Sequence, residues 1–444
     1  MYIQLTRFLL PLVLAMVAYE LGKQFLNGGM ARVPSAVETL ASYGLAWGIA
    51  MVLSSAQSQT RQLGLVLADS RQALRKVRQF VLGFSAVLSG VLAILAFTPV
   101  GTWLIEDLHA VETGMSSMVL QAIFWLIPYP IIDAQYRLVS GLLIRIRRTD
   151  IVSYASIAGI GMSIASVFLL LPVGFIRKEP ILLPVLVTYL GLLTELGINF
   201  IGFHRNRFLF LEESAKCSDV SRSPLTLDYV IGFFWPLAVI MMVQGASRPL
   251  VNLFVSRGPD GTEALAALTV VYALAHLPYG WLNEIRNLPA AFQNRENSLH
   301  YIRRFAAACG LVSFTAMVVM FWTPLRGFLL ETLIGVPPDL ALICATPLIL
   351  FSFFPLTVSI RAYLHGIGLI QHRTKALAPS GPARVLAIIV MLILLPEDLP
   401  GATRGVAALL CGFILETLVV WRGIEFGNET RGRPEPVKET EPTA

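Results

Sequence analysis

The sequence predicts an all-α polytopic membrane protein, with twelve transmembrane helices in two parallel six-helix bundles. Of its 444 residues, 55% are hydrophobic and only 14% are charged, whereas a soluble domain carries about 25% charged residues. Twelve apolar runs are long enough for a transmembrane helix, which takes about 20 residues. The second half of the chain also repeats the first. These observations argue against a water-soluble enzyme.

The predicted spans follow one another through short connections. We expect helices, because strands of a membrane barrel would alternate in hydrophobicity over about ten residues. The first run resembles a signal peptide, but it continues past Glu20 and Lys23 without a small-residue cleavage site, so we expect it to stay as a helix. The fourth and tenth runs are longer than a bilayer requires. The runs are 6–28, 35–59, 79–99, 114–144, 151–172, 181–203, 229–256, 262–289, 305–324, 340–371, 376–396 and 402–421.

An internal repeat relates the two halves at a nearly constant offset of 225 residues. Because each half holds an even number of spans, both have the same orientation, and a pseudo-two-fold axis along the membrane normal relates them. Matching pairs include Pro11 and Pro236, Asn27 and Asn252, Arg32 and Arg257, Glu38 and Glu263, Thr98 and Thr323, Pro130 and Pro355, Gly141 and Gly366, and Arg148 and Arg373. We expect an N-terminal bundle over 1–203, a cytoplasmic linker over 204–228, a C-terminal bundle over 229–427 and a disordered tail over 428–444.

The basic residues predict the orientation in the membrane. Of the 34 Lys and Arg residues, 24 fall in segments on one side of the predicted spans and six on the other. The positive-inside rule then places both termini in the cytoplasm of a multi-pass cell-membrane protein. The net charge of +6 therefore reflects topology, and we expect no nucleic-acid partner. The four cysteines have neither metal-ligand nor disulfide spacing, so we expect no metal and no cofactor.

The four remaining basic residues fall inside predicted spans and indicate an anion pathway. They are Lys23, Arg137, Arg248 and Arg361. A charged group inside a membrane costs at least about 2.5–3.5 kcal/mol, so such residues face the bundle interior or a wet cavity. Arg248 precedes Pro249, which can kink the helix. Its planar guanidinium suits phosphate or carboxylate oxygens.

Polar residues form stripes at helical spacing on two spans. Glu20, Lys23, Gln24 and Asn27 share one face of span one, and Gln244, Arg248 and Asn252 share one face of span seven. Other interpretations of the charges stay open. In one alternative Glu20 and Lys23 neutralise each other, and in another Asp133 and Arg137 pair at i, i+4. Arg248 could have a partner carboxylate elsewhere in the bundle, and Arg361 could snorkel to the interface.

Span eight carries the densest polar sequence. Pro278 and Gly280 predict a break or bend there, which exposes backbone groups to a cavity. His276 is either structural or a proton-coupling group. Glu195, the single acid in span six, is a proton site or the partner of a cation. Enzyme motifs are missing, and two parallel six-helix halves are typical of a transporter that works by alternating access.

Two long runs resemble the progressive ankylosis protein family. They are SRPLVNLFVSR, from Ser247 to Arg257, and HLPYGWLNEIR, from His276 to Arg286; shorter matches are LASYGLA at 40–46, FWTP at 321–324 and FSFFP at 351–355. The resemblance implies a bacterial member with the fold of the multidrug/oligosaccharidyl-lipid/polysaccharide exporter superfamily, two bundles around a central cavity. It also implies export of inorganic pyrophosphate, ATP or citrate.

The combined prediction is a secondary exporter of multivalent anions that functions as a monomer, and not an enzyme. The candidate substrate-binding residues are Lys23, Asn27, Asp133, Arg137, Arg248, Asn252, His276, Tyr279, Asn283, Glu284 and Arg361, and the coupling candidates are Glu20, Glu195 and His276. Two alternatives remain: a multidrug or lipid-linked substrate exporter of the same superfamily, and a non-transporting membrane regulator.

Overall fold

The computed structural model describes residues 1–30, 33–108, 113–218, 225–258, 260–293, 297–334, 336–396 and 398–429. The side chains of Glu20, Lys23 and Asn27 lie outside the described part, as does most of the predicted tail. Every regular element in these ranges is a helix. The N-terminal half contains α1 (Tyr2–Met30), α2 (Ala36–Ser54), η1 (Ala56–Gln59), α3 (Thr60–Gln62), η2 (Leu63–Leu67), α4 (Arg71–Phe97), α5 (Pro99–Thr102), η3 (Trp103–Leu108), α6 (Thr113–Leu126), α7 (Tyr129–Arg145), α8 (Thr149–Leu170), α9 (Gly174–Lys178) and α10 (Leu182–Arg205).

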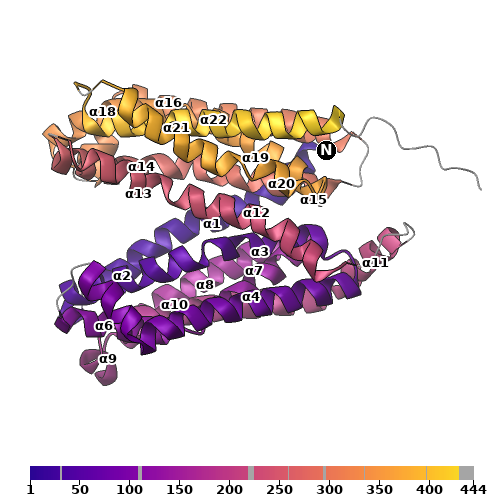
Figure 1. Ribbon diagram of the computed structural model, residues 1–444, viewed down its shortest axis with the longest axis horizontal. Coiled ribbons are helices and arrows are strands. Elements are labelled where there is room, and N and C mark those ends of the chain that lie inside the picture. Colours follow the sequence, from indigo (N-terminus) through magenta and orange to yellow (C-terminus); the bar gives the residue numbers. More distant parts are fainter. Residues whose placement is uncertain are drawn as a thin grey trace, which may run out of the picture.

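The chain continues through α11 (Arg207–Ser218), within the predicted linker, to the second half. This half contains α12 (Leu227–Gly245), α13 (Ser247–Val255), α14 (Gly261–Tyr279), η4 (Gly280–Asn287), α15 (Leu288–Phe292), α16 (Ser298–Trp322), α17 (Leu325–Gly327), η5 (Phe328–Ile334), α18 (Pro338–Phe351), α19 (Phe354–Ile370), α20 (Thr374–Leu377), α21 (Ser380–Leu394) and α22 (Gly401–Glu429). The two halves form two helical bundles that meet near α1 and α12 and diverge toward one end (Figure 1).

Helix length and composition agree with the predicted spans. Among the described residues, nine helices are long and apolar enough to cross a membrane, and eleven if each bent pair counts as one span. The helix α1 adds a shorter apolar stretch, Tyr2–Met16. The long fourth run is one of the bent pairs, because α6 and α7 meet at 43°. The sequence there is Ile-Pro-Tyr-Pro, and proline cannot donate the hydrogen bond that a straight helix requires.

The backbone itself repeats at the predicted offset. The π-helical segments η3 and η5 begin at Trp103 and Phe328, which are 225 residues apart. Arg147 and His372, also 225 apart, have φ angles of 59° and 55°, a left-handed conformation that is uncommon for residues other than glycine. The same unusual geometry at equivalent positions confirms that the halves are structural repeats.

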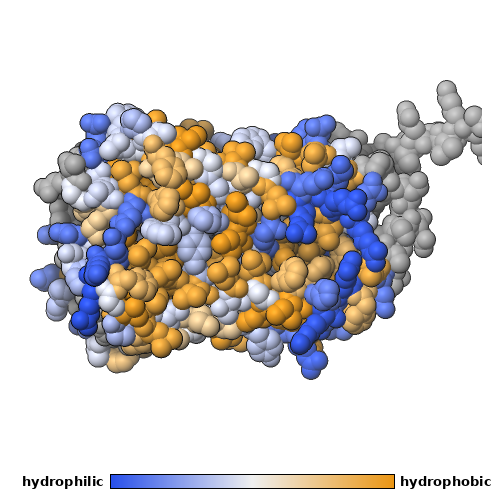
Figure 2. All heavy atoms as spheres, turned by 90° about the horizontal axis from the view of Figure 1, so that it is seen from below, coloured by the Kyte–Doolittle hydropathy of each residue, from blue (hydrophilic) through white to orange (hydrophobic). Residues whose placement is uncertain are grey.

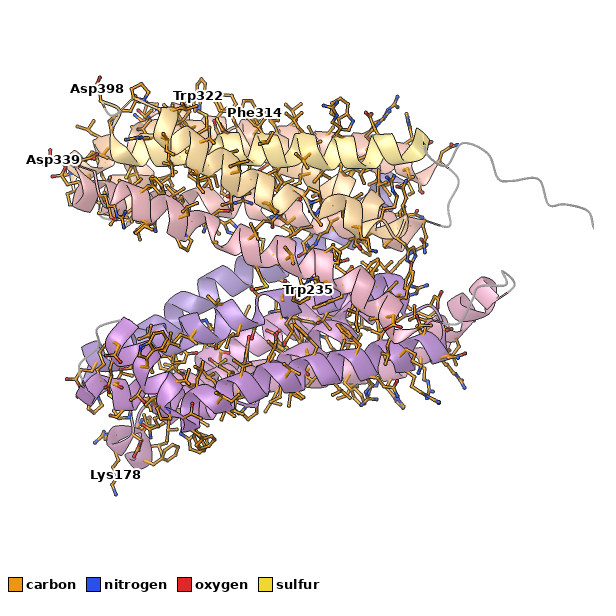
Figure 3. All side chains as sticks on the ribbon, in the orientation of Figure 1. Lys178, Trp235, Phe314, Trp322, Asp339 and Asp398 are labelled. Atoms are coloured by element: carbon orange, nitrogen blue, oxygen red, sulfur yellow. The ribbon has the colours of Figure 1, made fainter. Side chains whose placement is uncertain are left out.

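The two ends of the molecule differ in charge. The helix junctions at one end, called the basic end below, carry Arg71, Arg75, Lys76, Arg145, Arg148, Arg205, Arg303, Arg304, Arg373 and Arg422. Hydrophobic residues cover the middle of the visible face, and hydrophilic residues gather towards both ends (Figure 2). Lys178, Asp339 and Asp398 mark the opposite end (Figure 3). A hydrophobic belt between polar ends is what a bilayer requires.

At the basic end, the first helix of each half packs against the other half. The beginning of α1 packs on the second half, with the Phe8 ring 5.5 Å from that of Phe292. The beginning of α12 packs on the first half, with the Phe234 ring 5.0 Å from those of Phe80 and Phe84. Trp235 lies on the stretch of α12 that crosses between the bundles (Figure 3). The domain boundaries at 203, 228 and 427 therefore stay a prediction.

Candidate functional site

A buried charged cluster lies inside the C-terminal bundle around Glu416 of α22. Its carboxylate accepts hydrogen bonds from Arg361 (2.8 Å), from Arg384 (3.3 Å) and from the Gln244 amide. Glu416 is fully buried, and it lies 15 residues from the start of α22 and 13 from its end, or about 20 Å from each. These four residues, called the Glu416 cluster below, lie near the middle of the span.

The Glu416 cluster carries more positive than negative charge. Two arginines face one glutamate, and the ring of Phe413 lies 3.8 Å from the Arg384 guanidinium and 5.0 Å from that of Arg361. Burying charges costs several kcal/mol per ion unless partners compensate. The shared carboxylate and the aromatic face supply that compensation. The arginines leave a net charge of +1 inside the bundle.

Arg361 also connects this cluster to the irregular segment η4. Its second terminal nitrogen donates to the Asn283 side-chain oxygen at 2.7 Å. The predicted break in span eight is confirmed, because α14 ends at Tyr279 and a 3₁₀ segment follows from Gly280. Trp281 and Ser313 donate to the Pro278 carbonyl, so the break leaves that oxygen satisfied.

Equivalent residues of the two halves meet between the bundles. Gln62 of α3 donates to Asn287 of η4 at 3.2 Å, and these positions are 225 residues apart. Asn287 donates to Glu284 at 2.6 Å, and Arg61 pairs with Glu284 at 3.5 Å. A contact between equivalent residues lies on the pseudo-two-fold axis. We call Arg61, Gln62, Glu284 and Asn287 the axis cluster.

Arg286 is the equivalent of Arg61 in the second half. Both carbonyls pack against glycines that are themselves equivalent, Arg61 on Gly141 and Arg286 on Gly366. The Arg286 side chain makes no hydrogen bond or ion pair among the described residues, and its buried Nε has no partner. Glu284 is the charge that acts on it most strongly, and Arg61, Arg361 and Arg137 also lie within electrostatic range, so three arginines and one acid surround the Arg286 guanidinium. The region around the axis is therefore electropositive, with a guanidinium available to a ligand.

The N-terminal bundle holds a compensated ion pair. Asp133, which is 2% exposed, accepts from Arg137 Nε at 2.6 Å and from Gln57 at 2.8 Å. The i, i+4 pairing of Asp133 and Arg137 is thus observed, and Arg137 is not free to neutralise a substrate. Glu195 of α10 lies beside Tyr136 and packs on Gly159. Glu195 therefore sits close to this pair but outside it.

Arg248 has an aromatic partner instead of a carboxylate. Its guanidinium lies 4.9 Å from the centre of the Tyr272 ring, and no described acid pairs with it. The Asn252 side-chain oxygen and the Tyr272 hydroxyl are buried without hydrogen-bond partners. Cation–π stacking uses the face of a guanidinium and leaves the N–H groups at its edges able to donate hydrogen bonds to a ligand. These three groups form a second polar patch on α13 and α14.

The other predicted site residues have mixed surroundings. Tyr279 is 3% exposed, stacks on Phe351 and packs at a tilt against Phe354, as a core residue does. The His276 ring lies 5.5 Å from that of Tyr279. Arg361, Asn283 and Glu284 come together with η4, whereas Asp133 and Arg137 stay in the other bundle. Snorkelling of Arg361 to the interface is excluded, because its guanidinium is buried against Glu416.

The sequence analysis does not identify several residues of these clusters as site residues. Glu416 has a signal, since it is the one acid in the apolar run 402–421. Arg286 and Arg384 are among the 24 basic residues that the topology count places on the basic side, and this is wrong for Arg384, which is 6% exposed and bonded to Glu416. Gln62 and Asn287 have no sequence signal apart from their offset of 225, because uncharged amides are common near span ends.

The fold is that of solved MATE transporters. A mutant of the Vibrio cholerae MATE transporter VcmN matches with a TM-score of 0.73 and 12% identity, over 97% of this chain and 98% of that chain. The eukaryotic MATE transporter AtDTX14 matches at 0.67 and 14%, over 97% and 95%. An outward-facing multidrug resistance MATE family transporter of the MOP superfamily matches at 0.66 and 15%, over 97% and 96%. These matches show that the chain has the two-bundle fold of these transporters.

Within this fold the sequence is more specific. The profile of the progressive ankylosis protein (ANKH) family matches residues 1–323, which include the whole first half, α12 to α16 and both segments of the axis cluster. The chain belongs to this family. The resemblance carried by 247–257 and 276–286 is thereby confirmed.

Proposed function

We propose that the protein is a secondary transporter that exports multivalent anions by alternating access. The observation that carries the proposal is Arg286, which has no hydrogen bond or ion pair among the described residues and lies beside the pseudo-two-fold axis with its equivalent Arg61, which is paired with Glu284. An anion with two charged groups suits two equivalent guanidiniums, since each can donate two parallel hydrogen bonds. Inorganic pyrophosphate, phosphate-bearing metabolites such as ATP, and citrate are the proposed substrates.

Alternating access fits the contacts between the bundles. Contacts between the bundles occur at the basic end through α1, α12 and the axis cluster. Arg147 adds a hydrogen bond to the Ala291 carbonyl at 2.7 Å and covers the Phe292 ring at 4.8 Å. Parallel repeats of this kind rock against each other around a site between them. We infer that breaking these contacts opens the basic end, which we place in the cytoplasm because of its arginines.

The charge pairing favours an anion over a cationic drug. Two of the acids that could hold a cationic drug are neutralised, Asp133 by Arg137 and Glu416 by two arginines, which leaves Glu195 as the acid that a cation would need. Glu195 and His276 remain the proposed coupling groups, and Arg248 with Asn252 the proposed second contact for the anion. The pseudo-symmetric halves make a monomer sufficient for this mechanism.

The test is flux of labelled pyrophosphate and citrate into proteoliposomes that contain the purified protein. We expect Arg286→Gln and Arg248→Gln to raise KM by roughly tenfold or more, because a charged hydrogen bond contributes about 1.5–3 kcal/mol. Arg304→Gln, on the exposed start of α16, is the matched control and keeps wild-type flux. Unchanged KM in both site variants rejects the anion site. Flux of a cationic dye instead of either anion supports the drug-exporter alternative, and no flux at all supports a regulator.

A further inference from the structure

A groove of about 410 Å³ lies between α16, α19 and α22 of the C-terminal bundle. The helices α16 and α22 lie on the side of this bundle away from the N-terminal bundle (Figure 1). The floor of the groove is α19, through Ile360, Tyr363 and Leu364, and its walls are α16 and α22. Ile360 and Trp421 are half exposed. The wall on α16 is low because two of its residues there are alanines, Ala306 and Ala307.

The chemistry of the groove changes along its length. Arg303 of α16 is the one charged residue among those that line it. The Thr417 and Tyr363 hydroxyls already donate to the carbonyls of Phe413 (2.7 Å) and Leu299 (3.2 Å), so they add little polarity. The groove is therefore lined by apolar side chains, with the Arg303 guanidinium at one end.

The position of the groove matches the polar boundary of a bilayer. Arg303 is five residues from the start of α16, and Tyr363 is seven residues from the end of α19. Both distances are about 7–11 Å along a helix. Tyr and Trp side chains gather at the depth of lipid headgroups, and Trp421 faces the same groove.

We propose that this groove binds an anionic phospholipid, with one acyl chain along α19 and the phosphate on Arg303. The hydrocarbon chain matches the apolar floor, and the charge of the headgroup complements the single cation at that end of the groove. Pockets that combine basic residues with transmembrane helices select anionic headgroups. The proposal does not depend on which solute the protein transports.

The bound lipid would lie directly behind the Glu416 cluster. Ile360 and Thr417 line the groove, and the adjacent residues Arg361 and Glu416, about 100° further round the same two helices, form the buried ion pair. An acyl chain in the groove therefore packs on the helices that hold this pair together.

The experiment measures quenching of Trp421 by lipids with brominated chains, added at low mole fraction to the purified protein in detergent. The chain has seven tryptophans, so the Trp421 signal is the difference between the wild type and Trp421→Phe. Dibrominated phosphatidylglycerol is compared with phosphatidylcholine that carries the same chains. We expect phosphatidylglycerol to quench Trp421 at a mole fraction roughly fivefold lower, the preference that one arginine near a headgroup provides.

Two variants separate a specific site from general lipid contact. Arg303→Gln should abolish the preference for phosphatidylglycerol, and Arg304→Gln, its exposed neighbour outside the groove, should retain it. Ala307→Phe should fill the groove and weaken quenching by both lipids. Equal quenching by the two lipids in the wild type overturns the proposal, as does an equal loss of preference in Arg303→Gln and Arg304→Gln.

Discussion

Gln62 and Asn287 occupy equivalent positions of the two repeats, and their side-chain amides hydrogen-bond to each other at 3.2 Å across the pseudo-two-fold axis. The bond joins the first bundle to the second at the level of the 3₁₀ segment η4. Residues on such an axis contact their own equivalents, so they separate when the bundles rock apart. This makes the pair a sensitive position for the conformational equilibrium.

Gln62→Leu should shift the protein away from the conformation in which the bundles meet at the basic end. A hydrogen bond contributes about 0.5–1.5 kcal/mol net, and the stranded Asn287 adds to the loss. Spin labels at Lys178→Cys and Asp339→Cys, in a chain without its four native cysteines, report the distance between the bundles at the opposite end. We expect a new population at shorter distance. The double variant with Asn287→Leu should restore part of the original distribution, and identical distributions in all three chains would contradict the axis role.

Glu416→Gln should destabilise the C-terminal bundle strongly. It leaves two buried arginines without a carboxylate, and breaking a buried ion pair costs about 3–5 kcal/mol. Arg384→Met should cost much less, because a neutral pair of Arg361 and Glu416 remains. Thermal unfolding of the purified variants in detergent measures the difference. Equal melting temperatures for the two variants would show that the glutamate does not hold the cluster together.

Gly141→Ala and Gly366→Ala should each be damaging. An added methyl group would overlap the carbonyl oxygen of Arg61 in the first case and of Arg286 in the second, and overpacking costs about 1–3 kcal/mol. Gly161→Ala, on α8 with no neighbouring atom within 4 Å, is the control and should be neutral or slightly stabilising. Melting temperatures and pyrophosphate flux measure the effect. Wild-type melting temperatures and flux for both variants would mean that the backbone around Arg61 and Arg286 can shift to accommodate a methyl group.

The proposed orientation predicts which loops are accessible from outside the cell. Single cysteines at Lys178 and Arg75, both exposed but at opposite ends of the molecule, are treated in intact cells with a membrane-impermeant maleimide. Lys178→Cys should react, and Arg75→Cys should react only after the membrane is permeabilised. The reverse pattern would invert the topology and the proposed direction of transport.

The sequence by itself determined the fold class, the repeat and the break at Pro278 and Gly280. Apolar runs must span a bilayer, and an even number of spans in each half makes the repeats parallel, so these features follow from local composition and counting. The i, i+4 pair of Asp133 and Arg137 followed for the same reason, because both partners lie on one helix.

Only the tertiary structure decided which charges are neutralised. Arg361 and Arg384 belong to different helices from Glu416, and Arg61 belongs to a different bundle from Glu284, so no spacing along the chain relates them. Arg384 lies within the predicted run 376–396 but counts among the basic residues that set the topology, and only its guanidinium, buried on Phe413, shows that it belongs to the Glu416 cluster. Long side chains choose partners by distance in three dimensions, and that distance is set by how the helices pack.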